Sequence, residues 1–189
     1  MRAKLGIASV LALVAALASL QTASASNSWH QLHRPLDLPR VGPDEECPVS
    51  PVDDRIDWQS ANIFGGAGTG RGPVYPGLGE SGHLRTASEG SSSSWFGGKV
   101  FWYVTPKYRE RVLIRGRRLD GPESMRFSDD GRRSRQLRIR RKSDISWEGQ
   151  PPGSRGEPSG VLVRASGCYG VQIDGTNFSR TVVFTASTP

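Results

Sequence analysis

The chain has 189 residues, a net charge of +7, 23 glycines and 13 prolines. This glycine and proline content is high for a helical protein, but it is below the level that indicates wholesale disorder. Of the 25 basic residues 21 are arginine, and the stretch 107–142 holds 14 basic residues against 5 acidic ones, so the positive charge is concentrated in one part of the chain.

The first 25 residues have the pattern of a secretory signal peptide. Arg2 and Lys4 precede the uncharged run Leu5–Leu20, which at 16 residues is shorter than the ~20 residues that a helix needs to cross a bilayer. The sequence Ala-Ser-Ala at 23–25 supplies the small residues that a signal peptidase reads. We therefore predict cleavage after Ala25 and a secreted or periplasmic protein without a transmembrane segment in its mature form.

Residues 26–46 contain three prolines and show neither helical nor strand periodicity, which predicts an exposed, irregular N-terminal arm. The chain has two cysteines, Cys47 and Cys168. In an exported protein an isolated pair favours a disulfide over two buried thiols. Such a bond closes a loop of more than a hundred residues and restricts the unfolded chain, which stabilises the fold by about 4–5 kcal/mol.

The C-terminal half of the chain has the pattern of an all-β domain. No apolar period of 3.6 residues persists for three turns after residue 26. Short runs between turn sequences predict a β-sandwich or barrel. The runs with strand character are 99–104, 111–116, 136–141, 160–165, 168–174 and 178–184. In the last two runs alternation assigns to the core Tyr169, Val171, Ile173, Val182 and Phe184.

The ending GVLVRASGCYGVQIDGTNFSRTVVF resembles the last three strands of an immunoglobulin-like sandwich. More narrowly, VLIRGRRLDG and GCYGVQIDGTNFS are similar to an uncharacterised family of exported bacterial proteins with an immunoglobulin-like domain. The resemblance covers residues 47–184 loosely and these two motifs well. It implies an antiparallel immunoglobulin-like sandwich over residues 47–189, an extracytoplasmic location and the pairing of Cys47 with Cys168. It implies no activity, because none is established for the family.

The stretch KYRERVLIRGRRLDG (107–121) surrounds a short apolar run with five arginines. Alternation directs Val112 and Ile114 to the core, and Leu113, Arg115 and Arg117 to the opposite face. Two interpretations remain open. We favour a solvent-exposed face whose arginines are individually dispensable and partly neutralised by the acidic segments at 44–46 and 53–57.

The alternative interpretation is a docking surface for an anionic polymer, such as an envelope glycopolymer, lipid headgroups or extracellular nucleic acid. The segment 131–143 is the most basic part of the chain, with seven basic residues and no acidic one. It lacks the aromatic residues on which bases stack. The candidate binding residues are Arg115, Arg117, Arg118, Arg138, Arg140 and Arg141.

The stretch GLGESGHL (77–84) partly resembles the nucleophile of a serine hydrolase, with Ser81 flanked by glycines and His83 nearby. A nucleophile elbow requires glycine at position 83, so the match is incomplete. The glycine-rich loop 64–72 lacks the Lys-Ser/Thr ending of a phosphate-binding loop, and residues 53–57 lack the spacing of a calcium loop. These patterns indicate no metal ion and no cofactor.

The sequence therefore predicts an exported, non-catalytic interaction module whose partner is an unknown protein or cell-envelope component. Electrostatic binding to an anionic envelope polymer is the first alternative. A small serine hydrolase using Ser81 and His83 is the second.

Overall fold

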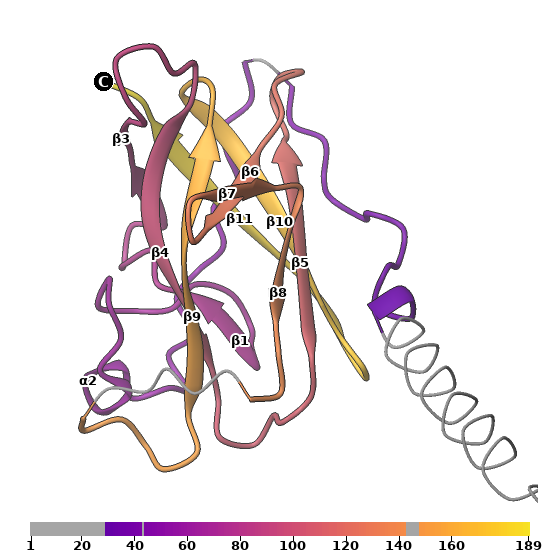
Figure 1. The fold of residues 1–189 in the computed structure, drawn as a ribbon, viewed down its shortest axis with the longest axis vertical. Helices are drawn as coiled ribbons and strands as arrows, with labels where there is room; N and C mark the ends of the chain where they lie inside the picture. Colours follow the sequence, from indigo (N-terminus) through magenta and orange to yellow (C-terminus); the bar gives the residue numbers. More distant parts are fainter. Residues whose placement is uncertain (1–28, 43, 143–147) are drawn as a thin grey trace, which may run out of the picture. The chain divides into compact units, whose positions relative to one another are not determined.

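The computed structural model describes residues 29–42, 44–142 and 148–189, and the chain divides into two units, Met1–Arg34 and Pro35–Pro189. Of the first unit only residues 29–34 are described. Residues 29–30 are helical and 31–32 form a turn, and the Leu32 N–H donates to the Trp29 carbonyl at 3.1 Å. The predicted signal peptide lies outside the described residues. The second unit contains the sheets (Figure 1).

In the described part of the second unit eleven strands form two sheets, and a short helix, α2 (Trp58–Ala61), lies outside them. The first sheet has the order β1 (Val74–Pro76), β4 (Phe96–Val104), β9 (Arg155–Val163), β6 (Arg126–Asp129), β7 (Arg132–Ser134), and β3 (Ala87–Ser88) also pairs with β4. The second has the order β2 (His83–Arg85), β11 (Ser179–Ser187), β10 (Gly167–Gly175), β5 (Val112–Arg118), β8 (Gln136–Ile139). The pairing of β2 with β11 is parallel, and the other pairings are antiparallel.

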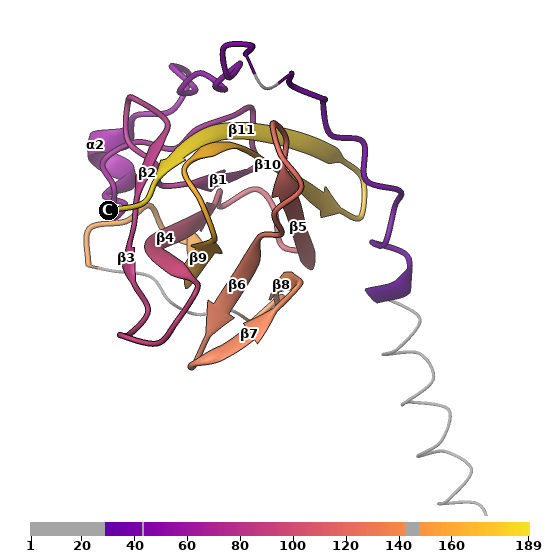
Figure 2. The same ribbon diagram turned by 90° about the horizontal axis from the view of Figure 1, so that it is seen from above.

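The two sheets pack face to face, as the view in Figure 2 shows, and enclose one apolar core. Trp102 of β4 and Phe127 of β6 come from the first sheet, and Ile114 of β5 comes from the second. The predicted inward residues Val112 and Ile114 are both buried. The predicted core of the last hairpin is also confirmed, since all its members are buried: Tyr169, Val171, Ile173, Val182 and Phe184. The chain is thus an all-β sandwich.

Each run predicted as a strand overlaps one, but five strands were missed. β1, β2, β3, β6 and β7 have only two to four residues each, which is too short for an alternating pattern to be visible. β9 also starts at Arg155, before the predicted residue 160. Its first half carries little apolar alternation, yet it pairs with β4 as far as Val104.

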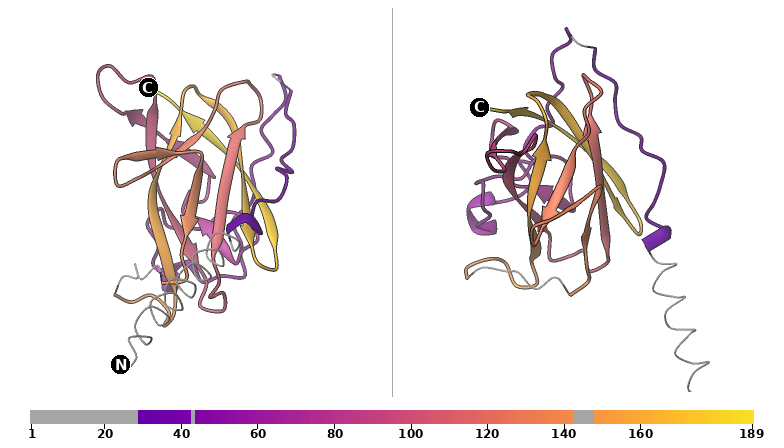
Figure 3. Two further views of the ribbon diagram at one scale, coloured as in Figure 1. Left: turned by 45° about the vertical axis from the view of Figure 1, so that its right-hand side comes forward. Right: turned by 45° about the horizontal axis from the view of Figure 1, so that its top comes forward.

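The predicted disulfide is confirmed, with Cys47 and Cys168 joined at a Cα–Cα distance of 5.5 Å. It lies outside the two-sheet core, in a second apolar cluster on the outer face of the second sheet, formed with Leu38, Val41, Leu119 and Val183. The arm is irregular as predicted, but Leu38 and Val41 are buried, so this part of it is not exposed. From Pro35 on, the arm (indigo in Figure 3) runs beside β10 and β11, where Asp37 is hydrogen-bonded to Gln172 and Thr181. In the described part of the chain, no helix is long and apolar enough to cross a membrane.

Candidate functional site

Arg115, the first of the candidate arginines, is bonded within the protein. Its Nη2 donates to Oδ2 of Asp174 at 2.8 Å, and the side chains of Arg115 and Asp174 are 15% and 0% exposed. Gln172 and Ser179 donate to the same carboxylate, at 3.0 and 2.7 Å respectively. The register explains the contact, because Arg115 pairs with Gln172 and residues two apart on a strand share a face. Arg115 therefore neutralises a buried carboxylate, and the interpretation of it as a solvated residue is wrong.

Arg117 holds the N-terminal arm. Its Nη2 donates to the carbonyl oxygens of Leu38 and Pro39, at 3.3 and 3.2 Å. The same arm is held from β10, where Oε1 of Gln172 accepts from the Asp37 N–H at 2.6 Å. The N-terminal arm therefore covers the outer face of the second sheet beside β5.

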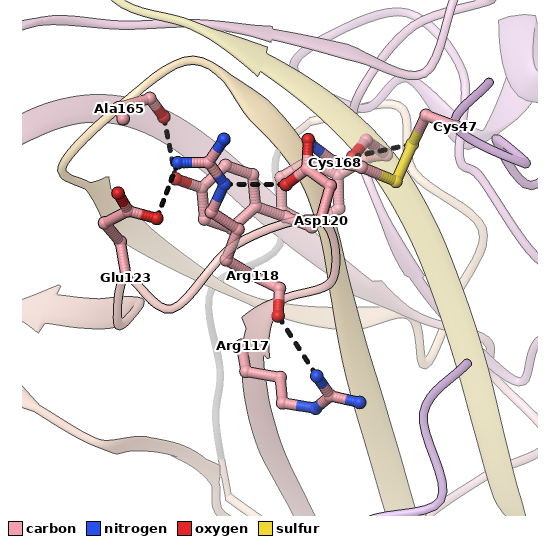
Figure 4. Close-up of polar contacts among 9 residues, drawn as sticks. Cys47, Arg117, Arg118, Asp120, Glu123, Ala165 and Cys168 are labelled. Carbon is pink, nitrogen blue, oxygen red and sulfur yellow. Dashed lines mark hydrogen bonds and ion pairs between the residues drawn. A yellow bond between two sulfur atoms is a disulfide. The ribbon is translucent and has the colours of Figure 1, made fainter. Parts of the chain in front are cut away.

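Arg118 stabilises the turn that follows β5 (Figure 4). Its Nε donates to Oδ1 of Asp120 and its Nη1 to Oε2 of Glu123, both at 2.6 Å. The other oxygen of Asp120 accepts from the Cys168 N–H at 3.0 Å, which connects the turn to the disulfide. Burial raises the pKa of Asp120, but the hydrogen bonds from Arg118 and Cys168 outweigh it and hold that pKa below its ordinary value. The bond to Asp120 in turn raises the pKa of Arg118.

The other three candidates, Arg138, Arg140 and Arg141, are exposed. Arg138 lies on β8 opposite Leu113 of β5, on the outer face of the sheet. Arg141 forms an ion pair with Glu110. The hairpin just before β8 adds further exposed arginines, which are Arg132, Arg133 and Arg135.

A cleft of about 610 Å³ lies between the β6–β7 hairpin and β8. β7 and β8 are the terminal strands of the two sheets, and they come together at one side of the sandwich (Figure 2). The cleft is lined by the basic residues Arg132, Arg138, Arg140 and Lys142. It is also lined by the carboxylates Asp129, Asp130 and Glu157. The structure thus gathers three of the exposed arginines, Arg132, Arg138 and Arg140, around a concave surface, which the sequence did not predict.

The acidic segment at 53–57 has partners other than the arginines of β5 and β8. Asp53 accepts from Nη2 of Arg55 at 2.6 Å and from the Tyr75 hydroxyl at 2.8 Å. The hydrogen bonds from Arg55 hold the pKa of Asp53 well below its ordinary value. Asp57 caps α2 by accepting from the Ser60 N–H at 3.1 Å. These two carboxylates are therefore occupied locally.

His83 is bonded to the neighbouring strand. Its Nδ1 lies 2.8 Å from Oγ1 of Thr185, and its Nε2 lies 3.0 Å from Oγ of Ser187. Both ring nitrogens thus contact hydroxyls of β11, and Ser81 lies exposed in the turn before β2. Within the described ranges, no group of three or more His, Cys, Asp or Glu side chains is arranged to hold a metal ion.

Sequence reasoning missed the acidic partners of the arginines on β5. Asp120 and Glu123 follow Arg118 by two and five residues, so the turn sequence LDGPE could have indicated them. Asp174 is 59 residues from Arg115, and only the register of β5 against β10 reveals that the two side chains meet.

Comparison of the chain with protein-family models and with curated proteins found no match. The resemblance of its two motifs to exported bacterial proteins with an immunoglobulin-like domain therefore stays a prediction.

Proposed function

We propose that this protein is an exported, non-catalytic binding module that attaches to an anionic polymer of the cell envelope. The proposed surface is the basic edge, which we define as the exposed residues Arg132, Arg133, Arg135, Arg138, Arg140 and Lys142. One observation carries the proposal. The arginines of β5 are partly buried, whereas the residues of the basic edge are exposed beside a cleft.

The charge of the basic edge suits a polymer with closely spaced negative groups. Each Lys or Arg near an anionic surface contributes roughly 1 kcal/mol, so several together give useful affinity without a deep pocket. Asp129 ends β6, Asp130 follows it, and Glu157 is on β9, so the carboxylates of the cleft lie on the side of the first sheet. The positive potential is therefore strongest toward β8, and we expect the polymer to lie along that strand.

We further propose that the sandwich is immunoglobulin-like. The parallel pairing of β2 with the last strand, β11, is consistent with such a fold. The hydroxyl of Tyr169 donates to the carbonyl of Ala165 at 2.7 Å, which is similar to the tyrosine corner of that fold. The disulfide differs from that of antibody domains, which joins the two sheets through the core, because Cys47 precedes the first strand.

The disulfide supports the proposal that the protein is exported. Disulfides persist in oxidising compartments and are rare in the cytosol. The signal-peptide pattern at 1–25 points to the same location. A polymer of the envelope is then within reach of the basic edge.

The test is titration of the exported protein with a teichoic acid and with heparin at several NaCl concentrations. We expect the affinity to fall steeply with salt, because binding releases counterions. The double variant Arg138→Gln/Arg140→Gln should bind about 30-fold more weakly, since each of the two arginines contributes roughly 1 kcal/mol.

The matched control is Arg40→Gln/Arg85→Gln, which removes two exposed arginines outside the basic edge. It should keep the affinity of the wild type. Equal decreases of affinity in the two double variants, or binding that does not depend on salt, would overturn the proposal.

A further inference from the structure

A second pocket, of about 660 Å³, shares no lining residue with the cleft at the basic edge. Its walls are largely apolar, and they come from α2 and from the segments that flank β1 and β4. We call it the tyrosine pocket, after Tyr75 and Tyr103. Its other apolar residues are Ile56, Ala61, Pro73, Pro106 and Pro151.

Hydrogen bonds hold the aromatic rings of the tyrosine pocket in place. The Tyr75 hydroxyl donates to Asp53, which is 5% exposed, at 2.8 Å, and the Tyr103 hydroxyl lies 3.0 Å from Oγ of Ser154. Burial, and then the neighbouring Asp53, raise the pKa of Tyr75 above its ordinary value, so the hydroxyl stays a donor. Gly72 has φ +52°, and a Cβ there would lie 2.1 Å from the Tyr75 oxygen. The pocket is therefore preformed.

The charges around the tyrosine pocket are unbalanced. Arg71, Lys107 and Arg180 line it and are exposed, and no ion pair holds them within the described part of the chain. Of the two carboxylates on the pocket, Asp53 is paired with Arg55, whereas Asp57 accepts from the neutral Ser60 and keeps its charge, so the lining has four cations and two anions. An apolar cavity therefore carries three cations that are available to a ligand.

We infer that the tyrosine pocket binds a small amphipathic anion, which is an organic acid with a ring-shaped apolar body. The volume is within the roughly 300–1,000 Å³ typical of small-molecule sites, and such sites combine apolar walls with a few placed polar groups. The apolar body packs against the half-buried Ile56 and Pro106, and the acidic group contacts Arg71, Lys107 and Arg180. This activity is independent of the basic edge and goes beyond polymer binding.

Two fluorescent probes that differ by one acidic group test the inference. 8-Anilinonaphthalene-1-sulfonate carries the sulfonate, and N-phenyl-1-naphthylamine lacks it. We expect one site with about tenfold tighter binding of the sulfonate, because a hydrogen bond to a charged group contributes about 1.5–3 kcal/mol. The triple variant Arg71→Gln/Lys107→Gln/Arg180→Gln should lose that preference and keep its affinity for the neutral probe.

Two controls locate the probes. Arg40→Gln/Arg85→Gln/Arg140→Gln removes the same charge from exposed positions that do not line the pocket, and both affinities should persist. Ser60→Trp places an indole at the mouth from an exposed position on α2, so both probes should lose binding, whereas Ser60→Ala should bind them normally. Equal affinity for the two probes, or unchanged binding in Ser60→Trp, would overturn the inference. Polymer binding at the basic edge should be the same in all these variants except the triple variant that contains Arg140→Gln.

Discussion

β5 and β8 are neighbouring strands of one sheet, and both have arginines within the strand or directly after it, but the surroundings of these arginines differ. On β5, Arg115 and Arg117 are bonded to Asp174 and to the N-terminal arm. On β8 and just after it, Arg138 and Arg140 are exposed. β5 lies between β10 and β8 and beneath the arm, whereas β8 ends the sheet. The role of an arginine here thus depends on what the fold places beside its strand.

The position of β8 also gives its charges a structural role. A terminal strand exposes unpaired backbone groups, and charged side chains discourage other chains from pairing with it. β7, the terminal strand of the first sheet, carries Arg132 and Arg133. Edge protection and polymer binding predict the same exposure of these residues, so only a binding measurement separates them.

Of the changes proposed here, removal of the disulfide should most strongly destabilise the packing of the N-terminal arm over β5. Replacing Cys47 and Cys168 by Ala opens a loop with a sequence separation of 121 residues and frees the cluster of Leu38 and Val41. We expect the free energy of unfolding, measured in urea, to fall by about 5 kcal/mol. A decrease below about 1 kcal/mol would show that the bond does not fix the arm.

Replacing a partly buried arginine of β5 should destabilise the protein more than replacing an exposed arginine of the basic edge. Arg115→Gln leaves the buried Asp174 charge without its ion pair, and we expect the free energy of unfolding to fall by about 3 kcal/mol, at the low end for a broken buried pair. Arg140→Gln should change stability by no more than about 0.5 kcal/mol, as exposed replacements usually do.

The double variant Arg115→Gln/Asp174→Asn provides the control for the buried pair. It removes the uncompensated charge as well, so it should be more stable than Arg115→Gln alone. Equal effects of Arg115→Gln and Arg140→Gln in urea unfolding would remove the distinction between the two strands.

The ion pair of Arg118 with Asp120 should have a smaller effect on stability, and this effect should depend on pH. The pKa of Asp120 is lowered in the folded protein, so its stabilising contribution is fully present above the ordinary carboxyl pKa of about 3.9 and is lost as the pH falls through the folded value. Arg118→Gln should cost about 1 kcal/mol at pH 7, as a partly exposed ion pair does. The difference from the wild type should shrink at pH 3, and an equal difference at both pH values would contradict the role of Asp120.

The sequence was sufficient for the inner face of the sandwich, because alternation is a local pattern. Val112, Ile114 and Tyr169 occupy the core as their spacing indicates. The outer face was not predictable, because alternation does not say what covers a face. Leu38 and Val41 lie in a segment without periodicity, and their burial depends on packing against distant strands.

The candidate sites were predictable only in part. Composition identified the basic segment 131–143. The cleft was not predictable, because it forms where the terminal strands of two different sheets meet. The tyrosine pocket combines Asp53, Pro73, Tyr103 and Pro151, which are far apart in the sequence and share no motif. Only the strand order brings such residues together.

The most direct test of the division between β5 and β8 is the salt dependence of polymer binding in two double variants. Arg138→Gln/Arg140→Gln and Arg117→Gln/Arg118→Gln remove the same charge from neighbouring strands. For a teichoic acid, the slope of log Kd against log NaCl should fall by about one to two in the β8 variant, because each arginine that neutralises a phosphate adds up to roughly one to the slope. The slope should stay unchanged in the β5 variant. Equal reductions in the two variants, or no reduction in either, would contradict the assignment of binding to β8.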